Sequence, residues 1–283
     1  MRTIKQQHRA LSAPIGDLVT YRALPTPSLE HLDPFLFLNH HGPQVYAPHN
    51  QGLPFGPHPH RGFETVTFIL DGDIMHQDTG GHQSVIQAGG VQWMTAGRGL
   101  IHAEVSSPDF KRAGGPLEIL QLWVNLPARA KLTEPRYVGL QEPEIPVVAL
   151  PGGGRLQAVS GRWLGMAGAV TSPAGVALAV LTLPAGASLS LPVPAAHTVF
   201  FYTVRGQLQV NGTATEARHL VEFNYDGDEL HLDATTDAVL LLGHGQPFRE
   251  PIVAYGPFVM NTEAEIRQAY QDYQAGRFGR WEE

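Results

Sequence analysis

The sequence of 283 residues contains no cysteine. Disulfide bonds, thiolate metal ligands and cysteine nucleophiles are therefore excluded, and any transition-metal site must use histidine, aspartate, glutamate or water. Charged residues are also scarce, at 16% of the chain, and the formal net charge is -7. Because this balance gives no electrostatic attraction to nucleic acid or anionic lipid, we expect neither as a direct partner.

Long apolar runs are missing as well. The amino-terminal stretch MRTIKQQHRALSAPIGD lacks the apolar core of a signal peptide. Elsewhere the apolar stretches are short and are broken by glycine, proline and polar residues, so we expect no membrane span. Together these absences lead us to expect a cytoplasmic protein.

Glycine and proline are abundant, with 31 and 23 residues scattered along the chain. They separate short runs rich in β-branched and aromatic residues, a pattern typical of all-β sandwiches and barrels. The runs include TVTFIL at 65–70, EILQLWVNL at 118–126, ALAVLTL at 177–183, TVFFYTV at 198–204 and AVLLLG at 238–243. One helix is predicted from Glu263 to about Ala275, with Thr262 as its N-cap and Gly276 after its end.

A boundary between two β-rich halves is predicted between about Glu134 and Arg155, where proline and glycine occur at turn-like spacing. The halves resemble a degenerate repeat, because FETVTFILDGD and HTVFFYTVRGQLQV both combine a hydrophobic run with a glycine turn. Only the first half has paired histidines close to such a run. We therefore expect a metal in the first half and none in the second.

Two pairs of potential metal ligands stand at positions i and i+2. His58 and His60 lie in GPHPHRGFET, and His102 and Glu104 lie in TAGRGLIHAE. On a strand, residues at this spacing project from the same face. Three imidazoles and one carboxylate from two strands would suit Fe(II), Mn, Ni, Cu or Zn.

Other polar residues near these motifs receive structural interpretations. His40 and His41 are interpreted as loop or surface residues, and the remaining single histidines as solvated or hydrogen-bonded side chains. Arg61 follows His60 directly and would point to the opposite face of a strand. We expect Arg61 to anchor the loop, for example through a salt bridge, rather than to act in catalysis.

The sequence resembles the cupin superfamily at this point. GLPFGPHPHRGFETVTFILDGD is similar to the first cupin motif, and AGRGLIHAE is similar to part of the second. The closing glycine, Gly72, comes one residue later than usual, and Gly97 stands where cupins often have proline. These departures resemble those of the pirin family, as do HPHRGFETVT, QWMTAGRGLIHAE, LQLWVNL and GPFVMNT, which span nearly the whole chain.

The resemblance implies two face-to-face antiparallel β-barrels, a bicupin of the double-stranded β-helix type, with a short C-terminal helix. Residues 1–140 would form the metal-binding barrel, and residues 141–283 a metal-free barrel plus the helix. The pirin ligands carry over onto His58, His60, His102 and Glu104. The family metal is one mononuclear Fe(II), whereas the donor set alone leaves Zn, Mn, Ni and Cu open.

In pirins the glutamate of the first motif is not a ligand, so the resemblance places Glu64 near the site without binding the metal. If side chains alternate regularly, Val66, Phe68 and Leu100 share the metal-facing side and could line the pocket. The alternative, which we favour, is that these three residues belong to the ordinary core of the barrel. Further candidates for the pocket are Phe35, Phe37, Trp93, Met94 and Gln121.

The resemblance also implies an activity, the opening of a flavonol such as quercetin by O₂ with loss of CO. The small aromatic substrate and O₂ would be the partners, and Glu104 would be the catalytic base. A second interpretation is a non-enzymatic regulatory protein that senses redox state through the metal and acts through a protein partner. A third is a cupin that binds a small molecule with Zn or Ni and performs no oxygen chemistry.

Overall fold

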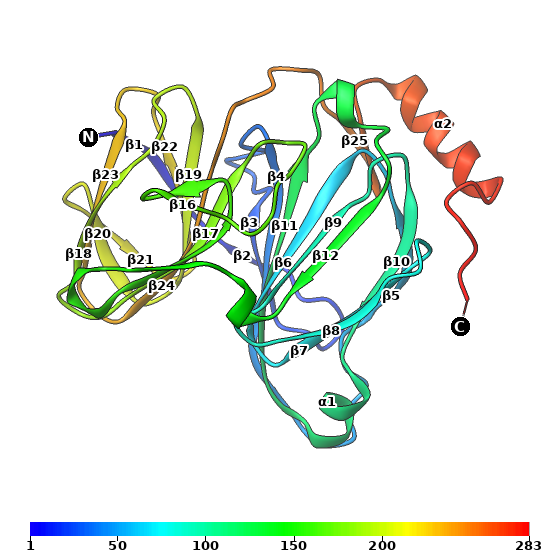
Figure 1. Ribbon diagram of the computed structural model, residues 1–283, viewed down its shortest axis with the longest axis horizontal. Helices are drawn as coiled ribbons and strands as arrows, with labels where there is room; N and C mark the ends of the chain where they lie inside the picture. The colour runs from blue at the N-terminus through cyan, green and yellow to red at the C-terminus, as the bar shows by residue number, and fades with distance from the viewer. Residues whose placement is uncertain (283) are drawn as a thin grey trace. The chain divides into compact units, whose positions relative to one another are not determined.

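The computed structural model describes residues 1–282, and most of them lie in β-strands (Figure 1). The chain divides into two compact units that are each built from separated segments. We call Ser12–Thr20, Phe35–Glu142 and Phe248–Glu283 the N-unit. We call Met1–Leu11, Tyr21–Pro34 and Pro143–Pro247 the C-unit. The division into domains at residue 140 stays a prediction, and the C-terminal helix belongs to the N-unit by this clustering.

The N-unit contains two antiparallel sheets. The larger includes the run β12-β9-β6-β11-β4, which the short strands β3 and β2 continue, and the smaller has the order β5-β10-β7-β8. Their strands are β4 (Phe35–Tyr46), β5 (Phe55–His60), β6 (Phe63–Asp71), β7 (Asp73–Asp78), β8 (Gln83–Gln87), β9 (Val91–Thr95), β10 (Leu100–Val105), β11 (Gly115–Asn125) and β12 (Arg136–Leu140). Outside the sheets are α1 (Pro108–Ala113), η1 (Ala128–Ala130), the hairpin of β25 (Val253–Tyr255) and β26 (Phe258–Met260), and α2 (Glu263–Gln274).

The C-unit repeats this arrangement with a sheet of order β1-β22-β19-β24-β17-β14-β13 and a sheet of order β18-β23-β20-β21. The strands of the larger sheet are β1 (Ile4–Arg9), β13 (Val147–Ala149), β14 (Arg155–Ser160), β17 (Ala177–Leu183), β19 (Thr198–Arg205), β22 (His219–Phe223) and β24 (Ala238–Gly245). The smaller sheet contains β18 (Ser188–Pro192), β20 (Gln207–Val210), β21 (Thr213–Glu216) and β23 (Glu229–Ala234). The hairpin of β15 (Arg162–Trp163) and β16 (Met166–Ala167) and the turn η3 (Pro151–Gly153) complete it. The short elements β2 (Leu11–Ser12), β3 (Thr20–Leu24) and η2 (Glu142–Glu144) fall where the chain passes from one unit to the other.

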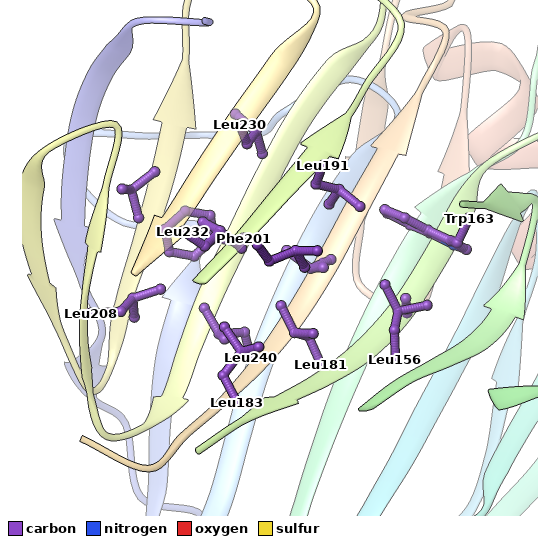
Figure 2. Packing of buried hydrophobic residues seen from close by; sticks show 14 of the residues in the cluster. Leu156, Trp163, Leu181, Leu183, Leu191, Phe201, Leu208, Leu230, Leu232 and Leu240 are labelled. Atoms are coloured by element: carbon purple, nitrogen blue, oxygen red, sulfur yellow. The ribbon is translucent and has the colours of Figure 1, made fainter. Parts of the chain in front are cut away.

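The interior of the C-unit is filled by apolar side chains. Leu156, Trp163, Phe201, Leu232 and Leu240 pack together with further leucines from both sheets (Figure 2). The smaller sheet shows why the sequence folds this way, since buried and more exposed residues alternate along β18 and β23. Such alternation places one face of an antiparallel sheet against the core and the other in solvent.

The predicted all-β fold of two cupin units is confirmed, with one refinement. Within residues 1–282, each unit is a sandwich of two sheets that do not close into a true barrel. The predicted helix is also confirmed, because α2 covers Glu263–Gln274 and the side chain of Thr262 accepts a hydrogen bond from the Glu265 amide at 3.2 Å. In the described part of the chain, neither helix is long and apolar enough to cross a bilayer.

Candidate metal centre

Strands β5 and β10 bring the three predicted histidine ligands together. In their antiparallel register His58 lies opposite His102, and His60 lies opposite Leu100. One ligand nitrogen from each of His58, His60 and His102 lies within 4.8 Å of the other two. No other group of three or more potential ligands this close occurs among residues 1–282.

The orientation of each ring leaves a nitrogen available for a metal. Nδ1 of His58 lies 2.7 Å from the Gly56 carbonyl oxygen, and Nδ1 of His60 lies 3.2 Å from the Pro257 carbonyl oxygen. A ring that donates from Nδ1 keeps its Nε2 lone pair free, which is the usual arrangement behind a metal-bound histidine. Nε2 of His102 lies only 3.0 Å from Nε2 of His58, so these lone pairs point into one small space.

Burial keeps two of these imidazoles uncharged. It lowers the pKa of His60 to about 3, with a smaller contribution from His58. It also lowers the pKa of His102 well below the ordinary histidine value, with further contributions from His60, His58 and His76. Since only the neutral imidazole ligates a metal, protons do not compete for these nitrogens near neutral pH.

Glu104 follows on β10 with its side chain held by three neutral donors, and it is not part of the cluster within 4.8 Å. Its carboxylate accepts hydrogen bonds from Thr67 Oγ1 at 2.9 Å and from Gln121 Nε2 at 2.5 Å. Gln92 Nε2 is a third donor. The donors come from β6, β11 and β9, so three strands of the larger sheet orient one carboxylate beside the histidines of the smaller sheet.

The predicted pocket residues divide between two faces. Thr67 faces Glu104, so its neighbours Val66 and Phe68 point to the opposite face of β6. Glu64 shares that opposite face, where its carboxylate accepts hydrogen bonds from Trp93 Nε1 at 3.0 Å and Thr95 Oγ1 at 2.7 Å.

Leu100 alternates with His102 and Glu104 along β10, so it shares their face of the strand. It is buried together with Met94 and Ala96. Leu100 therefore stays a candidate neighbour of the metal ligands, whereas the orientation of Val66 and Phe68 fits residues of the core.

Two aromatic side chains lie next to His60. The ring centres of Phe63 and Trp123 lie 4.9 Å and 5.3 Å from that of His60. Phe37 stacks on Trp123 with 4.6 Å between ring centres. Nε1 of Trp123 is buried and has no hydrogen-bond partner in the described residues, which leaves an N–H donor next to the candidate site. Trp123 lies in the LQLWVNL motif, but sequence reasoning gave it no role.

The C-terminal segment supports the end of β5, where His60 lies, and the turn that follows it. Besides the Pro257–His60 contact, the Val259 amide donates to the Arg61 carbonyl oxygen at 3.0 Å. Arg61 pairs with Asp272 of α2 at 2.8 Å and donates to the Arg98 carbonyl oxygen at 2.6 Å. The expected structural salt bridge of Arg61 is therefore present, and its partner lies on the C-terminal helix.

A buried lysine also holds the turn between β5 and β6 in place. Lys131 Nζ donates to the carbonyl oxygens of Gly62 at 2.9 Å and Val259 at 3.0 Å, and to Asn125 Oδ1 at 2.7 Å. Burial lowers the pKa of Lys131 to about 8. This residue was missed at the level of sequence, because a single lysine without a local motif is usually a solvated surface residue.

The interpretation of His40 and His41 as surface residues is wrong. Both are fully buried on β4, where β11 pairs alongside. Nε2 of His40 lies 2.8 Å from Glu118 Oε1, and Nδ1 of His41 lies 2.8 Å from Thr20 Oγ1. A partner for one nitrogen of each ring lowers the cost of burying it, and these partners are distant in sequence.

The comparisons with known proteins agree with this architecture. The sequence matches the Pirin family over residues 17–124 and the Pirin C-terminal cupin domain over residues 178–279. A pirin-like protein of Caulobacter vibrioides is 40% identical over 259 residues, which cover 91% of this chain and 91% of that protein. Pirin of Homo sapiens is 35% identical over 288 residues, which cover 98% of this chain and 93% of that protein.

A solved structure extends the likeness to three dimensions. The crystal structure of quercetin 2,3-dioxygenase from Acinetobacter baumannii matches with a TM-score of 0.93 and 36% sequence identity, and the match covers 99% of both chains. Similarity of this extent includes both units and the segments that form the histidine cluster. The chain therefore belongs to the pirin family of bicupin proteins.

Proposed function

We propose that this protein is a metal-dependent dioxygenase that opens the central ring of flavonols such as quercetin with O₂. The observation that carries the proposal is the cluster of His58, His60 and His102, whose ring nitrogens converge beside a carboxylate and an aromatic wall. The resemblance to a solved quercetin 2,3-dioxygenase at 36% identity supports the choice of substrate class.

The metal centre in this proposal consists of the three histidines and Glu104. The donor set fits a divalent transition metal because the uncharged imidazoles point their free nitrogens at one space. We propose Fe(II), with Mn, Ni, Cu and Zn as the other metals that such ligands accept. When bound, the metal would supply Lewis acidity toward a substrate hydroxyl and the reactivity toward O₂ that side chains lack.

The side chains around the centre then bind and orient the substrate. The stacked rings of Phe37 and Trp123 give a planar flavonol an apolar surface, and the unpaired Trp123 Nε1 can donate a hydrogen bond to one of its oxygens. Glu104 accepts the proton of the substrate hydroxyl. Thr67, Gln92 and Gln121 hold the carboxylate in place for this transfer.

Oxygen consumption with quercetin tests the proposal. Purified, unchelated protein should take up one O₂ for each quercetin consumed, and His58→Ala should lose both its metal and this uptake. Glu104→Gln keeps the shape of the side chain but removes the proton acceptor, so it should lose turnover. His31→Ala, which changes an exposed histidine of the C-unit, is the control and should change neither quantity. Metal-loaded protein that takes up no oxygen with quercetin would contradict the proposal.

A redox-sensing regulatory role is the second candidate, and the link between the site and α2 favours it. His60 contacts Pro257, and Arg61 contacts Asp272 of α2, so a change at the centre can reach a helix with an exposed face. Oxidation of the metal would add a unit charge at a buried site. A protein partner whose affinity follows the oxidation state, without flavonol turnover, would favour this function over the dioxygenase.

A further inference from the structure

The surface of the C-unit contains an open pocket of about 730 Å³, lined in part by Ala177 and Val193 of the packed interior. Its walls are largely apolar and include Leu164, Pro192 and Val193. Two histidines, His197 and His244, also line it. Cavities of roughly 300–1,000 Å³ with apolar walls and a few converging polar groups are the usual form of a small-molecule site.

The two histidines form a hydrogen-bonded pair. Their Nδ1 atoms lie 3.0 Å apart, so one ring donates and the other accepts. In the neutral tautomers this requires, the donor ring keeps a lone pair at Nε2, and the acceptor ring carries a hydrogen at Nε2. Neither Nε2 atom has a hydrogen-bond partner within residues 1–282. The pair therefore offers one acceptor and one donor.

The pair is uncharged at neutral pH. Burial lowers the pKa of His244 to about 4, with smaller contributions from His197 and Arg2. Burial and then Arg2 lower the pKa of His197. The other charged groups of the cavity, Arg162 and Asp228, are exposed at its rim and have opposite signs.

The cavity is held in shape by buried contacts. Arg2 is fully buried, and its guanidinium donates to the carbonyl oxygens of Ala195 at 3.1 Å and His197 at 2.7 Å. The ring of Trp163 packs edgewise on His244 with 4.9 Å between centres, while its Nε1 donates to the Ser160 carbonyl oxygen at 3.0 Å. Both histidines are thus positioned by groups that do not themselves face a ligand.

Leu164 belongs to the lining of the pocket and to a tight hairpin turn. It lies at the tip of the β15–β16 hairpin with a φ of 48°, and Gly165 follows with a φ of 87°, as a two-residue hairpin turn requires, although leucine adopts this conformation less readily than glycine. Its side chain is 39% exposed although it is large and apolar. The leucine thus adds apolar surface at the edge of the pocket.

We propose that this cavity binds a small, uncharged aromatic molecule that carries a hydroxyl group. The apolar walls match the ring, and a hydroxyl can form a hydrogen bond with the free Nε2 of one histidine of the pair, either as donor or as acceptor. The pair supplies no net charge to compensate an ionised ligand, so a neutral one is favoured. The site uses no metal ligand of the N-unit and does not depend on the proposed dioxygenase activity.

The test is a calorimetric titration of the full chain at pH 7 with 2-naphthol, which is planar, neutral and hydroxylated. Naphthalene lacks the hydroxyl group, and 2-naphthoate replaces it with a charge. We expect saturable binding of 2-naphthol that weakens at least tenfold in His197→Ala and in His244→Ala. We expect His58→Ala, which empties the candidate metal centre of the N-unit, to retain this binding. His219→Ala is the matched control, because His219 is a partly buried histidine of the C-unit outside the cavity.

Leu164→Gly separates binding from folding. Glycine relieves the left-handed conformation at this position, so the variant should be at least as stable as the wild type. Removal of the apolar wall should nevertheless weaken 2-naphthol binding several-fold. The proposal is overturned if 2-naphthol does not bind saturably, if the histidine variants bind it unchanged, or if 2-naphthoate binds more tightly. A second metal equivalent that is lost in His244→Ala would also overturn it, because the pair would then be a metal site.

Discussion

The two units have the same order of strands in their smaller sheets, but the side chains inside differ: the N-unit contains the histidine cluster, and the C-unit contains apolar side chains. β5-β10-β7-β8 in the N-unit corresponds to β18-β23-β20-β21 in the C-unit. The pair of His58 and His102 across β5 and β10 has its counterpart in Leu189 and Leu232 across β18 and β23. Leucine has no lone pair to give a metal, and it fills the core that Figure 2 shows. A few inward positions thus decide whether this architecture holds a candidate metal centre or a packed apolar core.

We expect the largest effect, on metal content, when His102 of the N-unit is replaced by leucine, the residue at position 232 of the C-unit. His102→Leu should fold, because position 102 is fully buried and leucine is the residue at the corresponding position 232. It should reduce bound metal from about one equivalent per chain to nearly none, since the cluster loses one of its three imidazoles. Elemental analysis after dialysis measures this. His31→Leu is the control at an exposed histidine, and metal retained by His102→Leu would contradict the ligand assignment.

The reverse exchange should destabilise the protein. Leu232→His places an imidazole among Leu189, Leu191 and Phe201, which offer it no hydrogen-bond partner. Burying an unpaired polar ring and losing leucine packing should lower the free energy of unfolding by about 3 kcal/mol. Thermal unfolding followed by calorimetry measures the loss. A variant with unchanged melting temperature would show that this interior tolerates polar groups and would weaken the contrast between the units.

The buried lysine of the N-unit predicts a pH dependence. The pKa of Lys131 is lowered to about 8 from the ordinary value of 10.5, so between these values the unfolded chain binds a proton that the folded chain does not. Stability attributable to Lys131 should therefore rise as pH increases from about 8 to about 10.5, by up to about 3 kcal/mol.

The difference between wild type and Lys131→Met isolates this contribution. Tyrosines also titrate in the upper part of the range, and subtraction removes them because they are common to both proteins. Chemical denaturation at a series of pH values should give a difference in unfolding free energy that grows with pH. A difference that stays flat would mean that Lys131 keeps its proton in the folded state.

The smallest effect concerns the donors to Glu104. Gln92→Leu removes one of the three hydrogen bonds to Glu104, and also the acceptor of the Tyr137 hydroxyl at 3.4 Å, while Thr67 and Gln121 keep their bonds to Glu104. We expect about tenfold lower kcat with unchanged metal content, as is typical when a group that orients a metal-site residue is lost. Steady-state kinetics with quercetin measure this, and Gln83→Leu on the exposed edge of β8 is the control. A rise in KM alone would instead assign Gln92 to substrate binding.

The histidine cluster could be predicted from the sequence because its information is local. His58 and His60 form one pair at positions i and i+2, His102 and Glu104 form a second, and the resemblance assigned both pairs to one site. The sequence could not predict in the same way which residues of β6 face the metal site. Thr67 rather than Val66 or Phe68 faces Glu104, since its hydroxyl donates to that carboxylate.

The contacts between distant residues that hold the site in place could not be predicted from the sequence either. The Pro257 carbonyl that orients His60 is 197 residues away, and no local pattern pairs a proline carbonyl with a histidine. The burial of His40 was missed for the same reason, because its partner Glu118 lies on another strand. Sequence patterns assign a polar residue to the surface unless a hydrogen-bonding partner lies nearby in the chain. The partners here come close only through the pairing of strands.

The most direct test of the contrast between the units is an anomalous-scattering map from crystals of the metal-loaded protein. We predict one strong peak, bound by His58, His60, His102 and Glu104, and no peak among the leucines of the C-unit. A peak in the C-unit, or no peak at the three histidines of protein that elemental analysis shows to contain metal, would contradict this account.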